Sequence, residues 1–332
     1  MGTEIIHIEY YLPEKTLTSS QLENKFRTYS GQNLEKKLGI RLRHIAGDNE
    51  TALDLAQKAA EKIFEQYDKN LIDYLLLCTQ SPDYLLPTSA CILQERLGLR
   101  TDIGALDFSL GCSGFIYGLS LAKGLIAGGI ARNVLLLTSD TYSKHIHEKD
   151  YSNLAIFGDG AAAAVVTQFE REKIFKFVLG TDGRGHKNLI VPSGGMRARS
   201  RKDAPEKRDV NGSIRTDNHM FMDGPEIFNF TISTIPKLVD RILEANDSGM
   251  QDIDYVIFHQ ANNYILDYLR KKMKIPRDKF FNDIAETGNT VSASIPIALR
   301  DCLDRRIIKA GSSVLLVGFG VGYSWGGTII EL

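Results

Sequence analysis

Residues 107–119 read DFSLGCSGFIYGL, and the expected architecture is built around this stretch. It places Cys112 between Gly111 and Ser113-Gly114, at a junction between a loop and a helix. The segment that follows, 113–129, is apolar nearly all round, which predicts a buried helix. A thiol at a helix N-terminus faces the positive end of the helix dipole. We therefore predict that the pKa of Cys112 is lowered and that its thiol is reactive.

Both strands and helices are predicted around this junction. Short apolar runs rich in leucine or β-branched residues predict five buried strands, at 73–78, 133–139, 161–166, 254–259 and 313–319. The segment 51–67 carries apolar residues at helical spacing. Strands that alternate with helices predict a largely parallel α/β architecture.

The chain also contains an internal repeat. Asp73-Tyr74 is followed by three apolar residues, and 61 residues after Asp73 the run VLLL opens at Val134. Asp254-Tyr255 is followed by three apolar residues, and 60 residues after Asp254 the run VLLV opens at Val314. Two matches at nearly equal spacing predict a duplication. We expect two halves, 1–167 and 168–332.

Composition excludes several classes of function. The 332 residues carry 40 Lys and Arg against 41 Asp and Glu, so no global basic field exists to hold nucleic acid. The uncharged stretch 108–122, with 15 residues, is too short to cross a bilayer. The four cysteines form no C-x-x-C pair, so we expect no metal site. The N-terminus MGTEIIHIEY lacks the pattern of a signal peptide, and we expect a cytoplasmic protein.

Three further stretches contain candidate chemical groups. His259 ends the predicted strand 254–259 and opens a polar turn, although a lone histidine is more often structural. Asn289 lies in TGNTVSAS, where an asparagine is usually a cap or a turn residue. The segment 318–327 is dense in glycine, but its G-x-G-x-G spacing and its position near Leu332 exclude a dinucleotide fingerprint. Its backbone N–H groups could instead hold an oxyanion.

The other three cysteines, Cys78, Cys91 and Cys302, are predicted to be small buried residues.

Taken together, these residues resemble the thiolase superfamily, and within it the β-ketoacyl-[acyl-carrier-protein] synthase III family. The motifs that carry the resemblance run in order along nearly the whole chain. They are GIRLRHIA (39–46), DFSLGCSGFIYGL (107–119), FGDGAAA (157–163), MDGPEIF (222–228), HQANN (259–263), ETGNTVSASIP (286–296) and FGVGYSWGG (319–327). The resemblance implies a thiolase-like α/β fold, a five-layer αβαβα arrangement of two duplicated halves, and usually a homodimer.

The resemblance also implies a Cys-His-Asn triad, which falls on Cys112, His259 and Asn289. Cys112 would be acylated by a starter thioester, carried by acyl carrier protein or by coenzyme A. His259 and Asn289 would hold the carbonyl of a malonyl-type thioester while it loses CO₂. The backbone N–H groups of Cys112 and Val321 would form the oxyanion hole. No cofactor and no metal are implied.

Several positions depart from the family. Its coenzyme A users usually carry a Trp and an Arg where this chain has Asn33 and Lys37. Two further arginines that clamp coenzyme A correspond to Tyr151 and Tyr264. The stacking platform and much of the phosphate clamp are therefore missing. We hypothesise a specialised synthase, in fatty acid, specialised lipid or polyketide biosynthesis, whose starter is carrier-bound or unusual.

The expected substrate contacts are partly altered as well. Asn262 is retained and is expected to face the pantetheine arm, with Phe228 on the same substrate side. Val321 stands where the family usually has glycine, which keeps the N–H but predicts a stiffer loop or a narrower pocket. Leu86 falls where the family often has Phe at the dimer-side pocket wall, so a different acyl chain could be admitted.

The segment 196–208, MRARSRKDAPEKR, has six basic residues against two acidic ones and no apolar periodicity. It reads as a surface loop, either a solvated excursion or an anion dock for a carrier protein or a phosphate. The residues that would form such a dock are Arg197, Arg199, Arg201 and Lys202.

Two alternatives stay open for the same fold. The acyl-Cys112 could pass its acyl group to an oxygen or nitrogen nucleophile, although the retained Asn289 favours condensation. The chain could also be a silent partner subunit of a heteromeric synthase, although the complete triad argues against this. A biosynthetic thiolase is disfavoured because 318–327 holds no second cysteine.

Overall fold

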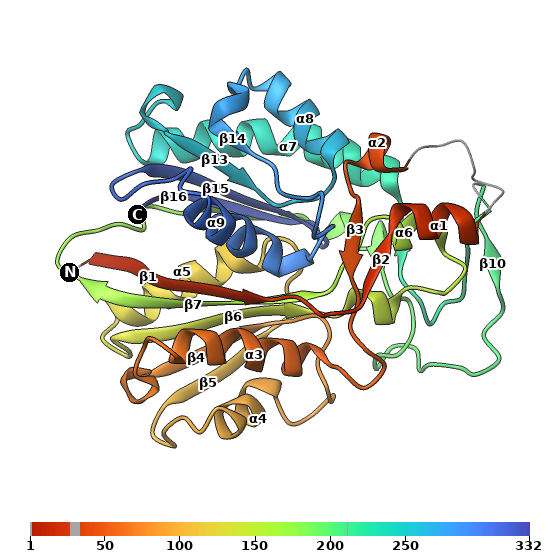
Figure 1. Cartoon of the computed structure of the whole chain (residues 1–332), viewed down its shortest axis with the longest axis horizontal. Helices are drawn as coiled ribbons and strands as arrows, with labels where there is room; N and C mark the ends of the chain where they lie inside the picture. The colour runs from red at the N-terminus through yellow and green to blue at the C-terminus, as the bar shows by residue number, and fades with distance from the viewer. Residues whose placement is uncertain (1, 27–33, 211) are drawn as a thin grey trace.

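Two five-stranded sheets form the frame of the computed structural model, which describes residues 2–26, 34–210 and 212–332 (Figure 1). The first sheet consists, in spatial order, of β1 (Gly2–Tyr11), β7 (Gly160–Phe169), β6 (Asn133–Asp140), β4 (Tyr74–Cys78) and β5 (Gly104–Phe108). The second consists of β8 (Val178–Thr181), β16 (Ser324–Glu331), β15 (Ser313–Gly320), β13 (Tyr255–Phe258) and β14 (Phe280–Phe281).

The two sheets have the same topology. In the first, β4 runs parallel to β5 and β6, whereas β7 runs antiparallel to β6 and β1. In the second, β13 runs parallel to β14 and β15, whereas β16 runs antiparallel to β15 and β8. This match confirms the predicted duplication, while the division of the halves at residue 167 stays a prediction.

The prediction of a largely parallel architecture is wrong, because half of the pairings in each sheet are antiparallel. For the second sheet, the reason is visible at the end of the chain. Only residues 321–323 separate β15 from β16, and a connection this short permits a hairpin but not a parallel crossover. Apolar runs in the sequence predict where strands lie, but they do not indicate whether neighbouring strands run parallel or antiparallel.

Six helices complete five layers. One outer layer is α3 (Ala52–Phe64) with α4 (Ser89–Arg96), which cover the first sheet. The middle layer is α5 (Gly114–Ala127) with α9 (Ser294–Asp304), which lie between the sheets. The other outer layer is α7 (Gly224–Ala245) with α8 (Asn263–Lys272), which cover the second sheet. The predicted αβαβα fold is confirmed.

The alternation of side chains along each strand explains the continuous apolar runs. In β6, Leu136 faces the middle layer, whereas Leu135 and Leu137 face α3. All three are fully buried, because the sheet is covered on both faces. The same geometry explains why α5 is apolar nearly all round, since it contacts both sheets.

The predicted helices are confirmed with small shifts at their ends. The helix expected over 51–67 is α3, which begins after Thr51. The Thr51 hydroxyl accepts from Asp54 N–H, and the Asp54 side chain accepts from Thr51 N–H, which together form a capping box. The helix expected over 113–129 is α5, which ends at Ala127 before two glycines.

The smaller elements gather at one end of the sheets, opposite to the chain termini (Figure 1). The carboxyl ends of β4, β6, β13 and β15 point to this end, which is where ligand sites form in α/β folds. The smaller elements are β2 (Thr16–Thr18), α1 (Ser19–Lys25), α2 (Leu34–Leu38), β3 (Leu42–His44), α6 (Tyr151–Leu154), β9 (Leu189–Ile190), β10 (Lys207–Arg208), β11 (Ile214–Arg215) and β12 (Phe221–Met222).

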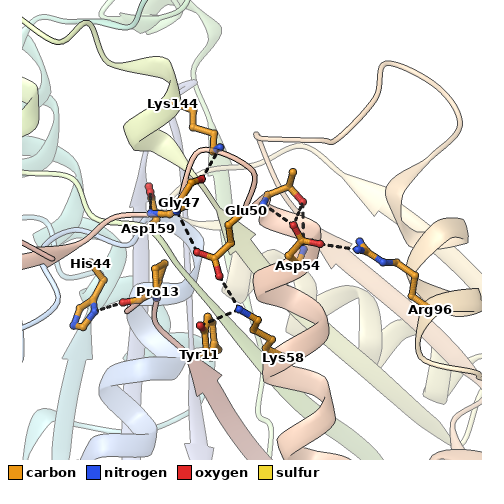
Figure 2. A network of polar contacts seen from close by, with 12 residues as sticks. Tyr11, Pro13, His44, Gly47, Glu50, Asp54, Lys58, Arg96, Lys144 and Asp159 are labelled. Carbon is orange, nitrogen blue, oxygen red and sulfur yellow. Dashed lines mark hydrogen bonds and ion pairs between the residues drawn. The ribbon is translucent and has the colours of Figure 1, made fainter. Parts of the chain in front are cut away.

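A polar network at the same end fixes the start of β7 (Figure 2). The buried Asp159 carboxylate accepts hydrogen bonds from the N–H groups of Ala46, at 2.7 Å, and Ser143, at 2.9 Å. Lys144 Nζ donates to the Gly47 carbonyl at 3.1 Å. The loop after β3 is thereby tied to the segment 157–160, which explains the aspartate of the FGDG motif.

Across the described ranges 2–26, 34–210 and 212–332, none of the helices combines the length and the apolar character that crossing a bilayer requires.

Candidate active site

Cys112 lies in the loop between β5 and α5, and only 6% of its surface is exposed. Helix α5 begins two residues later, at Gly114, and no side chain caps its first N–H groups. The thiol therefore lies beside the positive end of a 14-residue helix, as the sequence predicted.

Glycines of the last hairpin let the second sheet approach this loop closely. A Cβ on Gly320 would lie 2.9 Å from Cys112 Cβ and 3.0 Å from its Sγ. A Cβ on Gly318 would lie 2.9 Å from Ser113 Cα. The hydroxyls of Ser113 and Ser324 are 2.6 Å apart and join the two halves at the same point. The glycine-dense segment 318–327 therefore serves backbone packing against the cysteine loop.

His259 follows β13 directly and extends the sheet, because its N–H donates to the Val317 carbonyl at 2.8 Å. The ring is buried, and its edge meets the face of Phe319 at a centroid distance of 5.6 Å. Burial lowers the pKa of His259 to about 3, and a backbone contact with Val291 opposes this shift only in part. The imidazole is therefore neutral at physiological pH.

Asn289 is held by the backbone of the first half. Its N–H donates to the Ile156 carbonyl at 2.9 Å, and its carbonyl accepts from Gly158 N–H at 3.0 Å. Its side-chain Oδ1 accepts from Val291 N–H at 2.9 Å. Because an N–H group needs an acceptor, this contact fixes the amide so that its NH₂ group remains as a donor.

The loop of Asn289 corresponds to the loop of Cys112 in the duplicated fold. Cys112 lies between β5 and the middle-layer helix α5, and Asn289 lies between β14 and the middle-layer helix α9. The expectation that the two residues occupy related positions is therefore confirmed.

One cavity of about 120 Å³ brings Cys112, His259 and Asn289 together. The side chains come from three loops that are far apart in the chain. The remaining wall is mostly apolar and includes Ile156, Phe157, Leu189, Met222, Ile227, Thr231, Ala261, Ile265, Phe319 and Val321. A thiol and two nitrogen donors in a mostly apolar cavity can bind and polarise a thioester.

The predicted lowering of the Cys112 pKa is wrong for this resting site. Burial raises the pKa of the Cys112 thiol well above its usual range, and the nearby Asp140 carboxyl adds to the shift. Burial also raises the pKa of Asp140 to about 7, against hydrogen bonds from Ser292 and from Gln80 N–H. The sequence showed the helix N-terminus but not the depth of burial, which outweighs it.

Two backbone donors lie beside the thiol. Within the described part of the chain, neither Cys112 N–H nor Val321 N–H donates a hydrogen bond to another residue, and Cys112 N–H faces its own Sγ. Val321 lines the cavity together with Cys112, and its carbonyl is occupied by the Ser324 hydroxyl at 3.0 Å. An unoccupied pair of N–H groups next to a nucleophile suits a developing oxyanion.

Val321 also separates this cavity from a second one of about 720 Å³. Val321 and Leu189 line both cavities. The Val321 Cγ1 atom leans on Gly111, where a Cβ would come within 2.7 Å of it. The wall that this side chain forms supports the prediction of a narrower pocket.

Of the three side chains that were predicted to contact the substrate, one lines the cavity and two do not. Asn262 lines the cavity, and its Oδ1 also caps α8 by accepting from Ile265 N–H at 2.9 Å. Phe228 does not line the cavity. It packs against Tyr264, at a centroid distance of 5.4 Å, while its neighbour Ile227 forms part of the wall. Leu86 is 80% exposed and lines no part of this cavity within one chain.

Of the described positions that coenzyme A users would need, Lys37 is the one that offers a cation for phosphate. Asn33 lies outside the described residues. Lys37 is exposed on α2, which packs against α8. Tyr151 is buried against Phe26, at a centroid distance of 5.4 Å, so it cannot reach a ligand at the surface. Tyr264 is 60% exposed and offers a neutral ring.

The basic loop 196–208 is exposed almost throughout, as predicted for a surface loop. Arg201 pairs with Asp203 at 2.9 Å. Arg197, Arg199 and Lys202 form no ion pair with any residue that the structure describes. Gly195 and Ser200, at the edge of this loop, line the second cavity.

Sequence reasoning missed some residues of the site. Ser294 contacts the ring of His259 and lies within the TGNTVSAS motif, but only the packing of α9 shows which serine faces the histidine. Asp140 ends β6, one residue beyond the strand predicted over 133–139, and was not singled out from the sequence. Cys91 was expected to be buried and is exposed on α4, whereas Cys78 and Cys302 are buried as predicted.

Known proteins resemble this chain along its whole length. Residues 106–183 match the model of the family 3-oxoacyl-[acyl-carrier-protein (ACP)] synthase III, and residues 243–332 match the model of its C-terminal part. A β-ketoacyl-[acyl-carrier-protein] synthase III of Caldanaerobacter subterraneus is 38% identical, over 97% of this chain and 95% of the relative.

Solved structures agree with these matches. A crystal structure of a 3-oxoacyl-(acyl-carrier-protein) synthase III is 46% identical, covers 100% of both chains and has a TM-score of 0.98. The priming β-ketosynthase of the R1128 polyketide pathway is 25% identical, with 100% of this chain and 96% of that chain covered and a TM-score of 0.84. The chain therefore belongs to the β-ketoacyl-[acyl-carrier-protein] synthase III family, acyltransferases that form β-ketoacyl thioesters by decarboxylative condensation in fatty acid biosynthesis.

Proposed function

We propose that this protein condenses an acyl starter, bound to Cys112, with a malonyl-type thioester. The observation that carries the proposal is the convergence of Cys112, His259 and Asn289 on one apolar cavity. The three residues come from separate loops, and each has its own backbone anchor. A silent subunit would have no need of this arrangement.

In the first step, Sγ of Cys112 attacks the carbonyl carbon of the starter thioester. The oxyanion of the tetrahedral intermediate accepts hydrogen bonds from the N–H groups of Cys112 and Val321. Loss of one such donor would cost roughly 3–4 kcal/mol. The carbon–sulfur bond of the donor then breaks, and the proton of the Cys112 thiol leaves with the departing thiol. This route fits a cysteine that is protonated at rest.

In the second step, the N–H groups of His259 and Asn289 hold the carbonyl oxygen of the malonyl-type thioester. Loss of CO₂ leaves its electron pair in an enolate, whose negative oxygen these two donors stabilise. The enolate carbon attacks the acyl carbon on Cys112. The bond from that carbon to Sγ breaks, the β-ketoacyl thioester leaves, and the Cys112 thiolate takes up a proton from water.

We also propose that the starter arrives on a carrier protein or an unusual thioester. Buried Tyr151 and neutral Tyr264 support this, because neither can neutralise a coenzyme A phosphate. The unpaired cations of 196–208 would bind an acidic carrier. Asn262 would face the pantetheine arm with its remaining amide donor, and Phe228 would lie at the mouth beside Tyr264.

A homodimer is the assembly we propose. Tyr84, Leu85 and Leu86 form an exposed apolar loop after β4, and the exposed Leu106 lies nearby on β5, at the open edge of the first sheet. A second copy would bury these side chains and could bring Leu86 to a partner's pocket. The four free cysteines agree with a reducing compartment, and we place the enzyme in the cytoplasm.

Intact-mass measurements test the proposed reaction. Purified protein is exposed to acyl-coenzyme A and acyl-carrier thioesters beside Cys112→Ala and Cys91→Ala. We expect an acyl mass gain in the wild type and in Cys91→Ala, whose exposed thiol serves as the matched control, and none in Cys112→Ala. Gain from carriers alone supports the carrier-bound starter. An acyl mass gain from acetyl-coenzyme A at a normal rate contradicts the carrier-bound starter but still supports the proposed enzymatic activity. No gain from any donor supports the silent subunit.

Charge reversal tests the basic loop. We expect Arg197→Glu with Arg199→Glu to raise the KM for a carrier-bound starter about tenfold, because two unpaired cations are lost and two anions gained. The control pair, Arg306→Glu with Lys309→Glu, makes the same charge change on exposed residues near the start of β15. Equal KM values for the two double variants would contradict the dock.

Sedimentation velocity tests the assembly. The wild type should sediment as a dimer, and Leu86→Glu should shift it toward the 37.0 kDa monomer by placing a charge in the interface. Ile130→Glu, on a comparably exposed side chain at the opposite end of the strands, should leave the dimer intact. A monomeric wild type would disprove the homodimer.

A further inference from the structure

The buried nitrogen of His259 has an unusual partner for a ring that works in a cavity. Its Nδ1 lies 2.7 Å from Oγ of Ser294, the first residue of α9. Resting on the proposed function, we propose that Ser294 is a positioning residue that keeps the proton of His259 on Nε2, so that the imidazole serves the cavity as a donor and not as a base.

The hydrogens around Ser294 Oγ can be accounted for. Gln260 N–H lies 3.3 Å away and can only donate, so Oγ accepts from it. Among the residues the structure describes, the other polar atom within hydrogen-bond distance of Oγ is His259 Nδ1. The Val291 backbone also lies near the ring but forms no hydrogen bond with Oγ among the described residues, so the hydroxyl hydrogen has one acceptor, Nδ1. A nitrogen that accepts carries no proton, so a neutral ring must carry its proton on Nε2.

The opposite arrangement would be costly. If Nδ1–H donated to Oγ, the hydroxyl hydrogen would have no acceptor at a site where Ser294 is only 2% exposed. A buried donor without a partner costs about 1–3 kcal/mol. That penalty corresponds to a preference of roughly five- to 150-fold for the tautomer with Nε2–H.

Rigid elements on both sides hold this contact. His259 is fixed to β15 through its backbone bond with Val317. Ser294 begins α9, whose next residue, Ile295, is packed in the core between the sheets. The backbone of neither residue can move without moving a strand or a helix of the middle layer. The distance from Nδ1 to Oγ is therefore a property of the fold.

The fixed proton decides which chemistry His259 can perform. Nε2–H can donate to a thioester carbonyl, together with the NH₂ group of Asn289, whose Oδ1 is already occupied by Val291 N–H. Two donors stabilise an enolate. Acyl transfer to a hydroxyl or an amine needs instead a base that removes the acceptor's proton. Nε2–H cannot accept that proton, so Ser294 directs the site toward a carbon nucleophile.

The tautomer can be read directly in the wild type. Protein labelled with ¹⁵N in histidine is examined by NMR at pH 7, and His259 is assigned by comparison with His259→Gln. We expect the shifts of a ring with a bare Nδ1 and a protonated Nε2. A protonated Nδ1 in the wild type overturns the proposal, whatever the variants do.

Kinetics then tests the consequence. We expect Ser294→Ala to slow CO₂ release from a malonyl thioester about tenfold or more. The ¹⁵N shifts of His259 should then report a mixture of the two ring tautomers. The rate of Cys112 acylation should stay unchanged. Ser294→Thr keeps the hydroxyl and should restore both CO₂ release and the wild-type spectrum. Ser139→Ala removes another buried hydroxyl, far from the ring, and should change neither.

The outcomes separate the two proposals. Wild-type CO₂ release and an unchanged spectrum in Ser294→Ala overturn the role of Ser294 and leave the condensation intact. A wild type that is acylated but releases no CO₂ overturns the condensation, while the spectrum still reports the tautomer.

Discussion

The close approach of two backbones around Cys112 is the constraint on which the rest of the site depends. Gly318 and Gly320 of β15 lie where any side chain would meet the cysteine loop. This contact joins the duplicated halves at the point where each supplies chemistry, the thiol from the first and His259 and Asn289 from the second. The glycines let the two halves touch there without intervening side chains, so the three groups can meet in one cavity.

Much of the fold could be predicted because its layers leave a strong pattern in the sequence. Strands covered on both faces, such as β6, read as continuous apolar runs, and a helix between two sheets, such as α5, reads as apolar all round. Strand direction could not be predicted, because it is set by connection length and topology. The hairpin of β15 and β16 makes the second sheet mixed, and the antiparallel pairing of β7 with β6 makes the first sheet mixed.

The residues of the candidate site that lie within motifs could be predicted. The properties that depend on tertiary packing could not. Cys112, His259 and Asn289 were each weak signals alone, and the fold brings them to one cavity. The pKa of Cys112 was predicted in the wrong direction, because burial depth is a tertiary property. Ser294 was missed for the same reason, since its contact with His259 needs α9 in place.

The stability and reactivity of Gly318→Ala test the glycine contact most directly. A Cβ there would lie 3.0 Å from the Cys112 carbonyl oxygen, so we expect a loss of about 1–3 kcal/mol in the free energy of unfolding and slower acylation of Cys112. Gly124→Ala, in α5 with open space around its Cβ, should be neutral or stabilising by up to about 1 kcal/mol. A Gly318→Ala protein as stable and as readily acylated as the wild type would contradict the account.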